Sequence, residues 1–184
     1  MGHVIAGMTV SLDGFVADTA GGVSQLYADF AEFAGSESMK ATIAATGAVV
    51  MGRRTFEMGD PDEYLGTYEF QVPIFVVTTH PPERLPKQDD RLTFTFVSEG
   101  VASAVTQAKN AAGERDVQIV GGPNVIQQAL REGLIDELHV DIMPLLLGDG
   151  LRLFGGENFE QPSLVLREIE RQGQRTGLRL SVVR

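Results

Sequence analysis

The stretch Ile119-Val120-Gly121-Gly122-Pro123-Asn124-Val125-Ile126 decides the fold of this chain, because an apolar strand runs through two glycines directly into a segment of helical spacing. Paired glycines let a backbone come close to a bulky anion. The unpaired N–H groups and the positive dipole at the start of a helix favour a pyrophosphate there. The alternative is an ordinary strand-to-helix turn, in which glycine supplies an unusual φ and Pro123 opens the helix. This stretch alone leaves both alternatives open.

A second strand ends in the same way at Val49-Val50-Met51-Gly52-Arg53-Arg54-Thr55-Phe56-Glu57. Two arginines and a hydroxyl follow the glycine, and these groups are suited to gripping phosphate oxygens. The alternative is that both arginines are solvated surface residues. We favour phosphate binding, because ligands tend to gather at the carboxyl ends of strands in sheet proteins.

A third strand, Ile74-Phe75-Val76-Val77, is followed by the polar residues Thr78, Thr79 and His80. Two hydroxyls and an imidazole are able to receive a phosphate group, with Arg84 a few residues further on. Alternatively, the threonine hydroxyls bond locally to the backbone. Three such strand ends together are more informative than any one of them.

Short apolar runs alternate with segments of helical spacing along most of the chain, which predicts an α/β fold with a mostly parallel sheet and flanking helices. The final alternating segments, 163–170 and 177–183, predict a C-terminal antiparallel hairpin, so the sheet is mixed. The expected strands cover 3–10, 48–52, 73–78, 93–97, 117–120 and 135–143, and the expected helices cover 24–34, 36–46, 53–59, 100–112 and 123–132. Ser36 and Asn124 are expected at or near helix N-caps. The region 59–71 is expected to be a loop, and 1–184 a single domain.

Composition excludes several classes of function. The chain has 15 Lys and Arg against 25 Asp and Glu, and its net charge of −10 disfavours nucleic acid and anionic membranes as partners. It has no cysteine, which excludes thiolate zinc chemistry and fits a cytoplasmic protein. Neither a signal peptide nor a membrane-spanning run is present in the sequence given. No metal site is expected.

Two carboxylates are candidates for catalysis. Asp13 lies in an Asp-Gly pair after the first strand, where it is either a turn residue or a polar anchor at the mouth of a cleft. Asp29 flanks an apolar helix face formed by Leu26, Phe30 and Phe33, where partial burial would raise its pKa and let it relay a proton. A solvent-exposed position for Asp29 is the alternative.

Read in order, these segments resemble dihydrofolate reductase and its relatives over roughly residues 3–156. The resemblance implies their three-layer fold and a bound NADPH. It implies that Gly52, Arg53, Arg54 and Thr55 meet the cofactor phosphates, that Thr78, Thr79 and His80 receive the adenine nucleotide and its 2′-phosphate, and that Gly121, Gly122, Pro123, Asn124 and Val125 form the pyrophosphate-binding turn. In such relatives the glycine pair often carries a cis peptide.

Other motifs are most similar to the reductase domain of the riboflavin-biosynthesis deaminase-reductase: Ser-Leu-Asp-Gly at 11–14, Pro-Leu-Leu-Leu-Gly-Asp-Gly at 144–150 and Leu-Phe-Gly-Gly at 153–156. That resemblance implies reduction of a 5-amino-6-(5-phosphoribosylamino)uracil-type heterocycle by a homodimer. From the residues themselves we expect Asp13, and secondarily Asp29, to orient the substrate or to help deliver the balancing proton. Tyr27-Ala28-Asp29-Phe30 instead resembles the helix that carries the substrate carboxylate in dihydrofolate reductase. A pteridine or dihydrofolate reductase therefore remains an alternative, as does an NADPH-binding module without catalysis.

Overall fold

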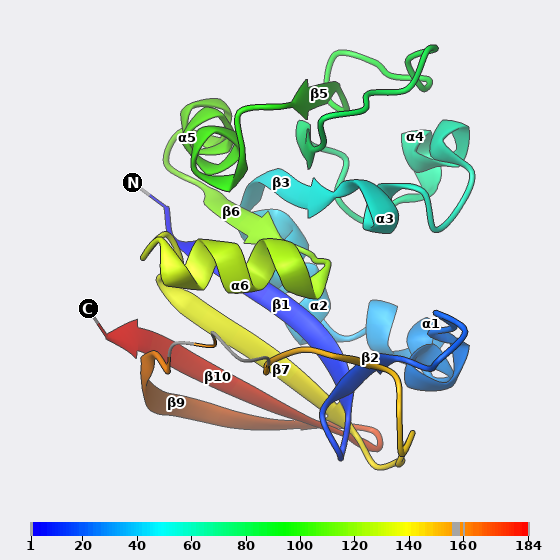
Figure 1. Cartoon of the computed structure of the whole chain (residues 1–184), viewed down its shortest axis with the longest axis vertical. Coiled ribbons are helices and arrows are strands. Elements are labelled where there is room, and N and C mark those ends of the chain that lie inside the picture. The colour runs from blue at the N-terminus through cyan, green and yellow to red at the C-terminus, as the bar shows by residue number, and fades with distance from the viewer. Residues whose placement is uncertain (1, 156–158, 160, 184) are drawn as a thin grey trace.

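The computed structural model describes residues 2–155, 159 and 161–183, and one eight-stranded sheet forms its centre (Figure 1). The strand order is β5-β4-β3-β6-β1-β7-β10-β9. Their bounds are β1 Val4–Ser11, β3 Thr46–Gly52, β4 Ile74–Val77, β5 Phe94–Val97, β6 Asp116–Ile119, β7 Glu137–Met143, β9 Ser163–Gln172 and β10 Arg175–Val183. The strands from β5 to β7 run parallel, and β10 is antiparallel to both β7 and β9. The expected mixed sheet and C-terminal hairpin are therefore confirmed.

Helices cover both faces of this sheet. The α-helices are α1 Phe30–Ala34, α2 Glu37–Ala45, α3 Arg53–Phe56, α4 Tyr64–Thr67, α5 Val101–Ala112 and α6 Pro123–Arg131; η1 Ser24–Tyr27 and η2 Pro61–Glu63 are 3₁₀ turns. Side chains alternate along β3, so that Val50 packs with α5 and α6 on one face while Val49 packs with Met39 of α2 on the other. In Figure 1, α6 lies in front of β1 and α2 lies behind it. The result is the three-layer arrangement that the sequence predicts.

The expected helix 24–34 is wrong, because the segment breaks into η1 and α1 at Asp29. The cause lies far away in the sequence. The buried Arg175 donates a hydrogen bond to the carbonyl of Leu26 at 3.0 Å, and that carbonyl would otherwise accept the next helical bond. The expected helix 36–46 is confirmed as α2, and Ser36 is its N-cap, with its hydroxyl accepting from the N–H of Met39.

Smaller differences concern turns that periodicity does not reveal. The loop 59–71 contains η2 and α4, and the helix expected at 53–59 is a single turn. Asn124 lies in the first turn of α6, whose N-cap is Gly122. A second sheet, which the sequence did not predict, pairs β2 (Phe15–Ala17) with β8 (Leu151–Arg152).

Two further observations concern membrane spans and the end of the 153–156 motif. No helix in the described part of the chain has the length and apolar character that a membrane span requires. Gly156, the last residue of the expected motif at 153–156, lies outside the described residues.

Candidate active site

Three of the strand ends singled out in the sequence lie next to one another, because β4, β3 and β6 are neighbours in the parallel sheet. Gly52 pairs in register with Val77, the residue before Thr78. The N–H of Gly52 also donates a hydrogen bond to the carbonyl of Gly121 at 2.8 Å. Segments about 70 residues apart in sequence are thereby joined directly at one edge of the sheet.

The glycine pair Gly121-Gly122 brings backbone without side chains to this edge, with Gly121 buried and Gly122 partly exposed. The peptide bond between them is cis, and Gly121 has a φ of +117°, which L side chains rarely adopt. A Cβ on Gly121 would lie 2.7 Å from Met8 Cε and 3.5 Å from Thr55 Oγ1. No backbone acceptor in the described ranges takes the N–H groups of Gly122 and Asn124. The turn therefore offers free donors and a hydroxyl to a closely approaching anion, which fits a pyrophosphate.

Positive charge lies beside this turn. Arg53 is half-exposed and makes one long contact of 3.5 Å with Glu57 on the same helical turn. Arg54 is exposed, and no hydrogen bond or ion pair joins it to any described residue. Both guanidinium groups are thus available to a bound phosphate.

The remaining residues of the predicted glycine turn act differently from one another. Pro123 and Val125 are buried in the core, so they fix the start of α6 and present no side chain to a ligand. Asn124 is exposed, and its carbonyl oxygen accepts a hydrogen bond from the side chain of Gln128. Backbone, rather than side chains, is what this turn offers.

At the end of β4, the structure shows local contacts of the threonine hydroxyls, which the sequence analysis gave as the alternative to phosphate binding. The Thr78 hydroxyl accepts a hydrogen bond from the N–H of His80 at 3.0 Å. Thr79 Oγ1 and His80 Nδ1 are exposed and lie 2.9 Å apart. Arg84 is paired with Asp62 at 2.7 Å. Thr79 and His80 therefore face solvent with polar atoms, and Arg84, although paired, is also exposed.

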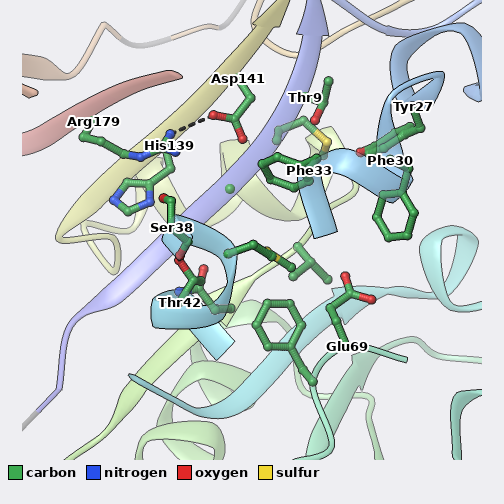
Figure 2. A pocket seen from close by; sticks show the side chains of 16 residues that line it. Thr9, Tyr27, Phe30, Phe33, Ser38, Thr42, Glu69, His139, Asp141 and Arg179 are labelled. Atoms are coloured by element: carbon green, nitrogen blue, oxygen red, sulfur yellow. Dashed lines mark hydrogen bonds and ion pairs between the residues drawn. The ribbon is translucent and has the colours of Figure 1, made fainter. Parts of the chain in front are cut away.

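A pocket of about 140 Å³ lies between the sheet and the helices α1 and α2 (Figure 2). It opens where β6 leaves β1, since their pairing ends at Ala6 with Ile119 while β1 continues along β7 to Ser11. The lining residues are Gly7, Met8, Thr9, Tyr27, Phe30, Phe33, Ser38, Met39, Thr42, Glu69, Phe70, Gln118, Val120, His139, Asp141 and Arg179. Val120 directly precedes the glycine pair, so the pocket adjoins the candidate cofactor edge.

Ion pairs occupy the charged groups on one side of the pocket. Arg179 binds Asp141 at 2.8 Å and Glu170 at 2.7 Å, so its single positive charge is shared by two carboxylates. Ser38 also donates to Glu170. No unpaired cation lines the pocket among the described residues.

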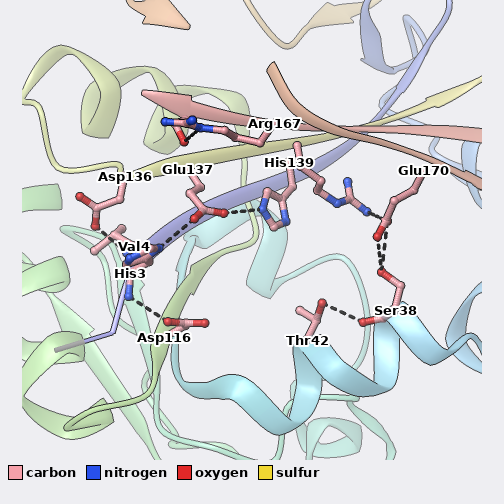
Figure 3. A network of polar contacts seen from close by, with 12 residues as sticks. His3, Val4, Ser38, Thr42, Asp116, Asp136, Glu137, His139, Arg167 and Glu170 are labelled. Carbon is pink, nitrogen blue, oxygen red and sulfur yellow. Dashed lines mark hydrogen bonds and ion pairs between the residues drawn. The ribbon is translucent and has the colours of Figure 1, made fainter. Parts of the chain in front are cut away.

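A short polar chain runs from His139 of the pocket to the surface (Figure 3). Glu137 lies between His139, at 3.0 Å, and His3, at 2.8 Å. Burial lowers the pKa of His139, which keeps the imidazole neutral. Burial alone would raise the pKa of Glu137. The hydrogen bonds from both histidines outweigh this effect, so the net result is a pKa below the usual value. The described residues contain no cluster of three or more such groups suited to a metal.

Asp13 holds two loops together. Its carboxylate accepts hydrogen bonds from the hydroxyl of Ser11 at 2.6 Å and from the N–H groups of Leu147 and Gly148 at 3.2 and 2.8 Å. These bonds, led by that from Ser11, lower the pKa of Asp13 to about 2. Asp13 is therefore ionised at neutral pH, and its oxygens anchor the 144–150 loop to the turn after β1.

Asp29 is not among the residues that line the pocket. Both of its oxygens are bound by Arg175, at 2.6 to 3.0 Å, and this bond lowers the pKa of Asp29 despite partial burial. Arg175 is 1% exposed, also donates to Thr9 Oγ1 at 2.8 Å, and lies over the ring of Phe33 at 4.5 Å. The pair supports the pocket wall from behind.

The sequence did not single out Glu69, His139 or Arg175. Glu69 belongs to the acidic and aromatic segment 59–71, which is the only signal that could have drawn attention to it. Burial raises the pKa of the Glu69 carboxyl. His139 and Arg175 lie on strands where alternation alone predicts ordinary solvated positions.

Comparison with known proteins gives a family and a fold. The family model described as the RibD C-terminal domain matches residues 2–178. A Shewanella sp. PV-4 structure assigned to riboflavin biosynthesis is 25% identical, with a TM-score of 0.78 over 99% of both chains. The Thermotoga maritima diaminohydroxyphosphoribosylaminopyrimidine deaminase/5-amino-6-(5-phosphoribosylamino)uracil reductase is 14% identical, with a TM-score of 0.71 over 99% of this chain and 57% of that one. Dihydrofolate reductase from Enterococcus faecalis, complexed with NADP(H), is 14% identical, with a TM-score of 0.59 over 98% of this chain and 96% of that one. The last two likenesses show a shared fold.

Proposed function

Since this chain belongs to the RibD C-terminal domain family, we propose that it is an NADPH-dependent reductase of a small heterocycle. The family match and its structural neighbours support a reductase role. The observation that carries the proposal is the hydrogen bond between Gly52 and Gly121, which places two arginines and a bare glycine turn beside a pocket. We place this activity in the cytoplasm, which the absence of cysteine supports.

The residues of the sheet edge are suited to hold such a cofactor. Arg53, Arg54 and the Thr55 hydroxyl would bind its phosphates together with the free N–H groups of the glycine turn. Thr79 and His80 are exposed at the adjacent strand end, where they would meet the adenine nucleotide. When bound, the nicotinamide supplies a hydride. The pocket beside Val120 would hold and orient the acceptor carbon, and its aromatic walls would exclude water.

The substrate we put first is 5-amino-6-(5-phosphoribosylamino)uracil or a similar riboflavin-pathway pyrimidine, on the strength of the family. One observation favours a second candidate, a pteridine or dihydrofolate. Arg179 is committed to Asp141 and Glu170, so the pocket interior offers no free cation to a substrate phosphate. A phosphorylated substrate would have to keep its phosphate outside this pocket.

We also propose that the protein is a homodimer. Leu164, Leu166 and Ile169 on the edge strand β9 are 40%, 51% and 62% exposed. They pair with Val182, Leu180 and Leu178 of β10, so their side chains share one face of the sheet. An exposed apolar face on an edge strand is typical of a protein–protein interface.

Titration of the purified protein with NADPH and NADH, followed by cofactor fluorescence, tests the central proposal. We expect NADPH to bind more tightly than NADH, because the 2′-phosphate adds a charged contact. Absence of binding by either at millimolar concentration would contradict it. Turnover with the pyrimidine and with dihydrofolate, measured as loss of NADPH absorbance, separates the two substrates. Cofactor binding without turnover of any heterocycle tested would leave the binding module as the better description.

A further inference from the structure

Glu69 is the carboxyl group of the pocket that has no assigned role. It follows Tyr68, the C-cap of α4, and lines the pocket together with Tyr27 and Phe30 (Figure 2). Among the described residues, no side chain donates a hydrogen bond to it and no cation pairs with it; its only hydrogen bond is to its own N–H. A half-buried carboxyl without a partner is costly as an anion and is therefore stabilised as the neutral acid.

The other titratable groups around the pocket are already engaged. Asp141 is paired with Arg179, His139 with Glu137, and Asp29 with Arg175. The groups that face Glu69 itself are the phenols of Tyr27 from η1, of Tyr64 from α4 and of Tyr68, the C-cap of α4. Burial raises the pKa of Tyr27, so this phenol keeps its own proton. Glu69 is the remaining acid that can release one into the pocket.

We propose that Glu69 is the substrate-facing acid of this reductase, which supplies the proton that balances hydride addition to a C=N or C=O bond. The inference rests on the proposed function and adds a residue to it. It also describes the substrate: the acceptor nitrogen or oxygen lies against a carboxyl whose acid form burial favours, and the described residues of the pocket include no free cation, so that part of the substrate is uncharged and accepts hydrogen bonds.

The step balances in atoms and charge. Hydride adds to the carbon, and the π electron pair moves to the attached nitrogen or oxygen. That atom forms a new N–H or O–H bond as the O–H bond of Glu69 breaks. The products are the reduced substrate, the oxidised nicotinamide and the Glu69 carboxylate, which takes its next proton from water.

The protonation state of Glu69 can be measured without substrate or cofactor. Burial raises the pKa values of all three tyrosines of the chain, Tyr27, Tyr64 and Tyr68, and the Glu69 charge raises them further, so their rings report its ionisation. In NMR spectra of protein with ¹³C-labelled tyrosine, we expect the ring signals to shift together at a pH above the usual range of a glutamic acid. Glu69→Gln should abolish this shift. The matched variant Glu63→Gln, on the exposed η2 turn of the same segment, should keep it.

Kinetics complete the test. At neutral pH, Glu69→Gln should lower kcat about 10²- to 10⁴-fold with dihydrofolate or the pyrimidine, whichever is turned over, while NADPH affinity stays within about twofold. A tyrosine shift that survives in Glu69→Gln, or a variant with wild-type kcat, would overturn the inference. Loss of NADPH binding by the wild-type protein would instead refute the proposed function, and the tyrosine titration would still decide whether Glu69 is a neutral acid.

Discussion

The buried guanidinium of Arg175 holds both carboxylate oxygens of Asp29, across 146 residues of sequence. This pair joins the C-terminal hairpin to the segment between η1 and α1, and it stands directly behind the pocket residues Thr9, Tyr27 and Phe33. Asp29 is thereby a structural group, and the wall of the pocket depends on it.

Substituting Asp29 should lower the free energy of unfolding more than substituting Arg175. Arg175 is 1% exposed and Asp29 is 20% exposed, so Asp29→Ala strands a buried charge while Arg175→Met leaves a carboxylate that water can reach. We expect a loss of about 3–5 kcal/mol for Asp29→Ala and a smaller loss for Arg175→Met, measured by urea unfolding. Equal losses would argue against the pair as drawn.

The same pair predicts a pH dependence. Its bond to Arg175 lowers the pKa of Asp29 in the folded state, so the stabilisation is present above the unfolded-state pKa and is lost as pH falls through the folded value. The stability difference between wild type and Asp29→Ala should therefore be constant near neutral pH and begin to shrink below about pH 4. Thermal unfolding at a series of pH values checks this.

Asp13 should behave as an anchor and not as an acid. Its pKa of about 2 leaves no proton to donate at neutral pH. Asp13→Asn should leave the shape of the kcat–pH profile unchanged and lower kcat by less than about tenfold, through looser closure of the 144–150 loop. If Asp13→Asn instead removed the decrease in kcat at high pH, Asp13 would be identified as the proton donor.

Arg54 should contribute directly to cofactor affinity. Because it has no partner in the described structure, Arg54→Ala removes a phosphate contact without breaking an ion pair. We expect NADPH binding to weaken by about 1.5–3 kcal/mol in a fluorescence titration, with unfolding unchanged. Arg171→Ala, an exposed arginine on β9, is the control and should bind NADPH as wild type does.

Gly121→Ala tests the glycine turn. Alanine at a φ of +117° is strained by about 1–3 kcal/mol, and its Cβ would lie 2.7 Å from Met8 Cε and displace that side chain beside the turn. Reduced stability and lost NADPH binding are expected together. Gly59 has a permissive φ and no neighbour within 4 Å of an added Cβ, so Gly59→Ala should affect neither measurement.

The proposed dimer depends on the apolar face of β9. Leu166→Asp places a charge in that face and should convert a dimer into a folded monomer, as measured by light scattering after size-exclusion chromatography. Glu168→Lys, on the same strand, changes charge on the opposite face, because Glu168 pairs with Arg179, and this variant should remain dimeric. A wild-type monomer would refute the dimer without affecting the reductase proposal.

Sequence alone predicted the sheet, since the strand expected at 48–52 contains the continuous apolar run Ala48-Val49-Val50-Met51, which is typical of a buried parallel strand. It also predicted which strand ends carry polar groups, and the parallel topology brings those ends together. It failed where one long-range contact overrides local periodicity, as when Arg175 takes the carbonyl of Leu26 and ends the helix expected at 24–34.

The role that we propose for Glu69 was beyond sequence reasoning for a related reason. Asp13, Asp29 and Glu69 are chemically alike, and their different roles follow from neighbours that only the fold supplies: backbone N–H groups, a buried arginine, and aromatic rings, respectively. Burial and partners set the protonation of a carboxyl, and neither can be counted along a sequence.

The hydrogen bond from Gly52 to Gly121 exists only when β3 and β6 have aligned in the finished sheet. A partly folded chain would lack these joined strand ends. Under the proposed function, NADPH therefore binds the native state and not the unfolded one. At a hundredfold excess over its Kd, such a ligand stabilises the native state by about 2.7 kcal/mol. The supply of reduced cofactor would then govern how long each molecule survives proteolysis, as well as how fast it works.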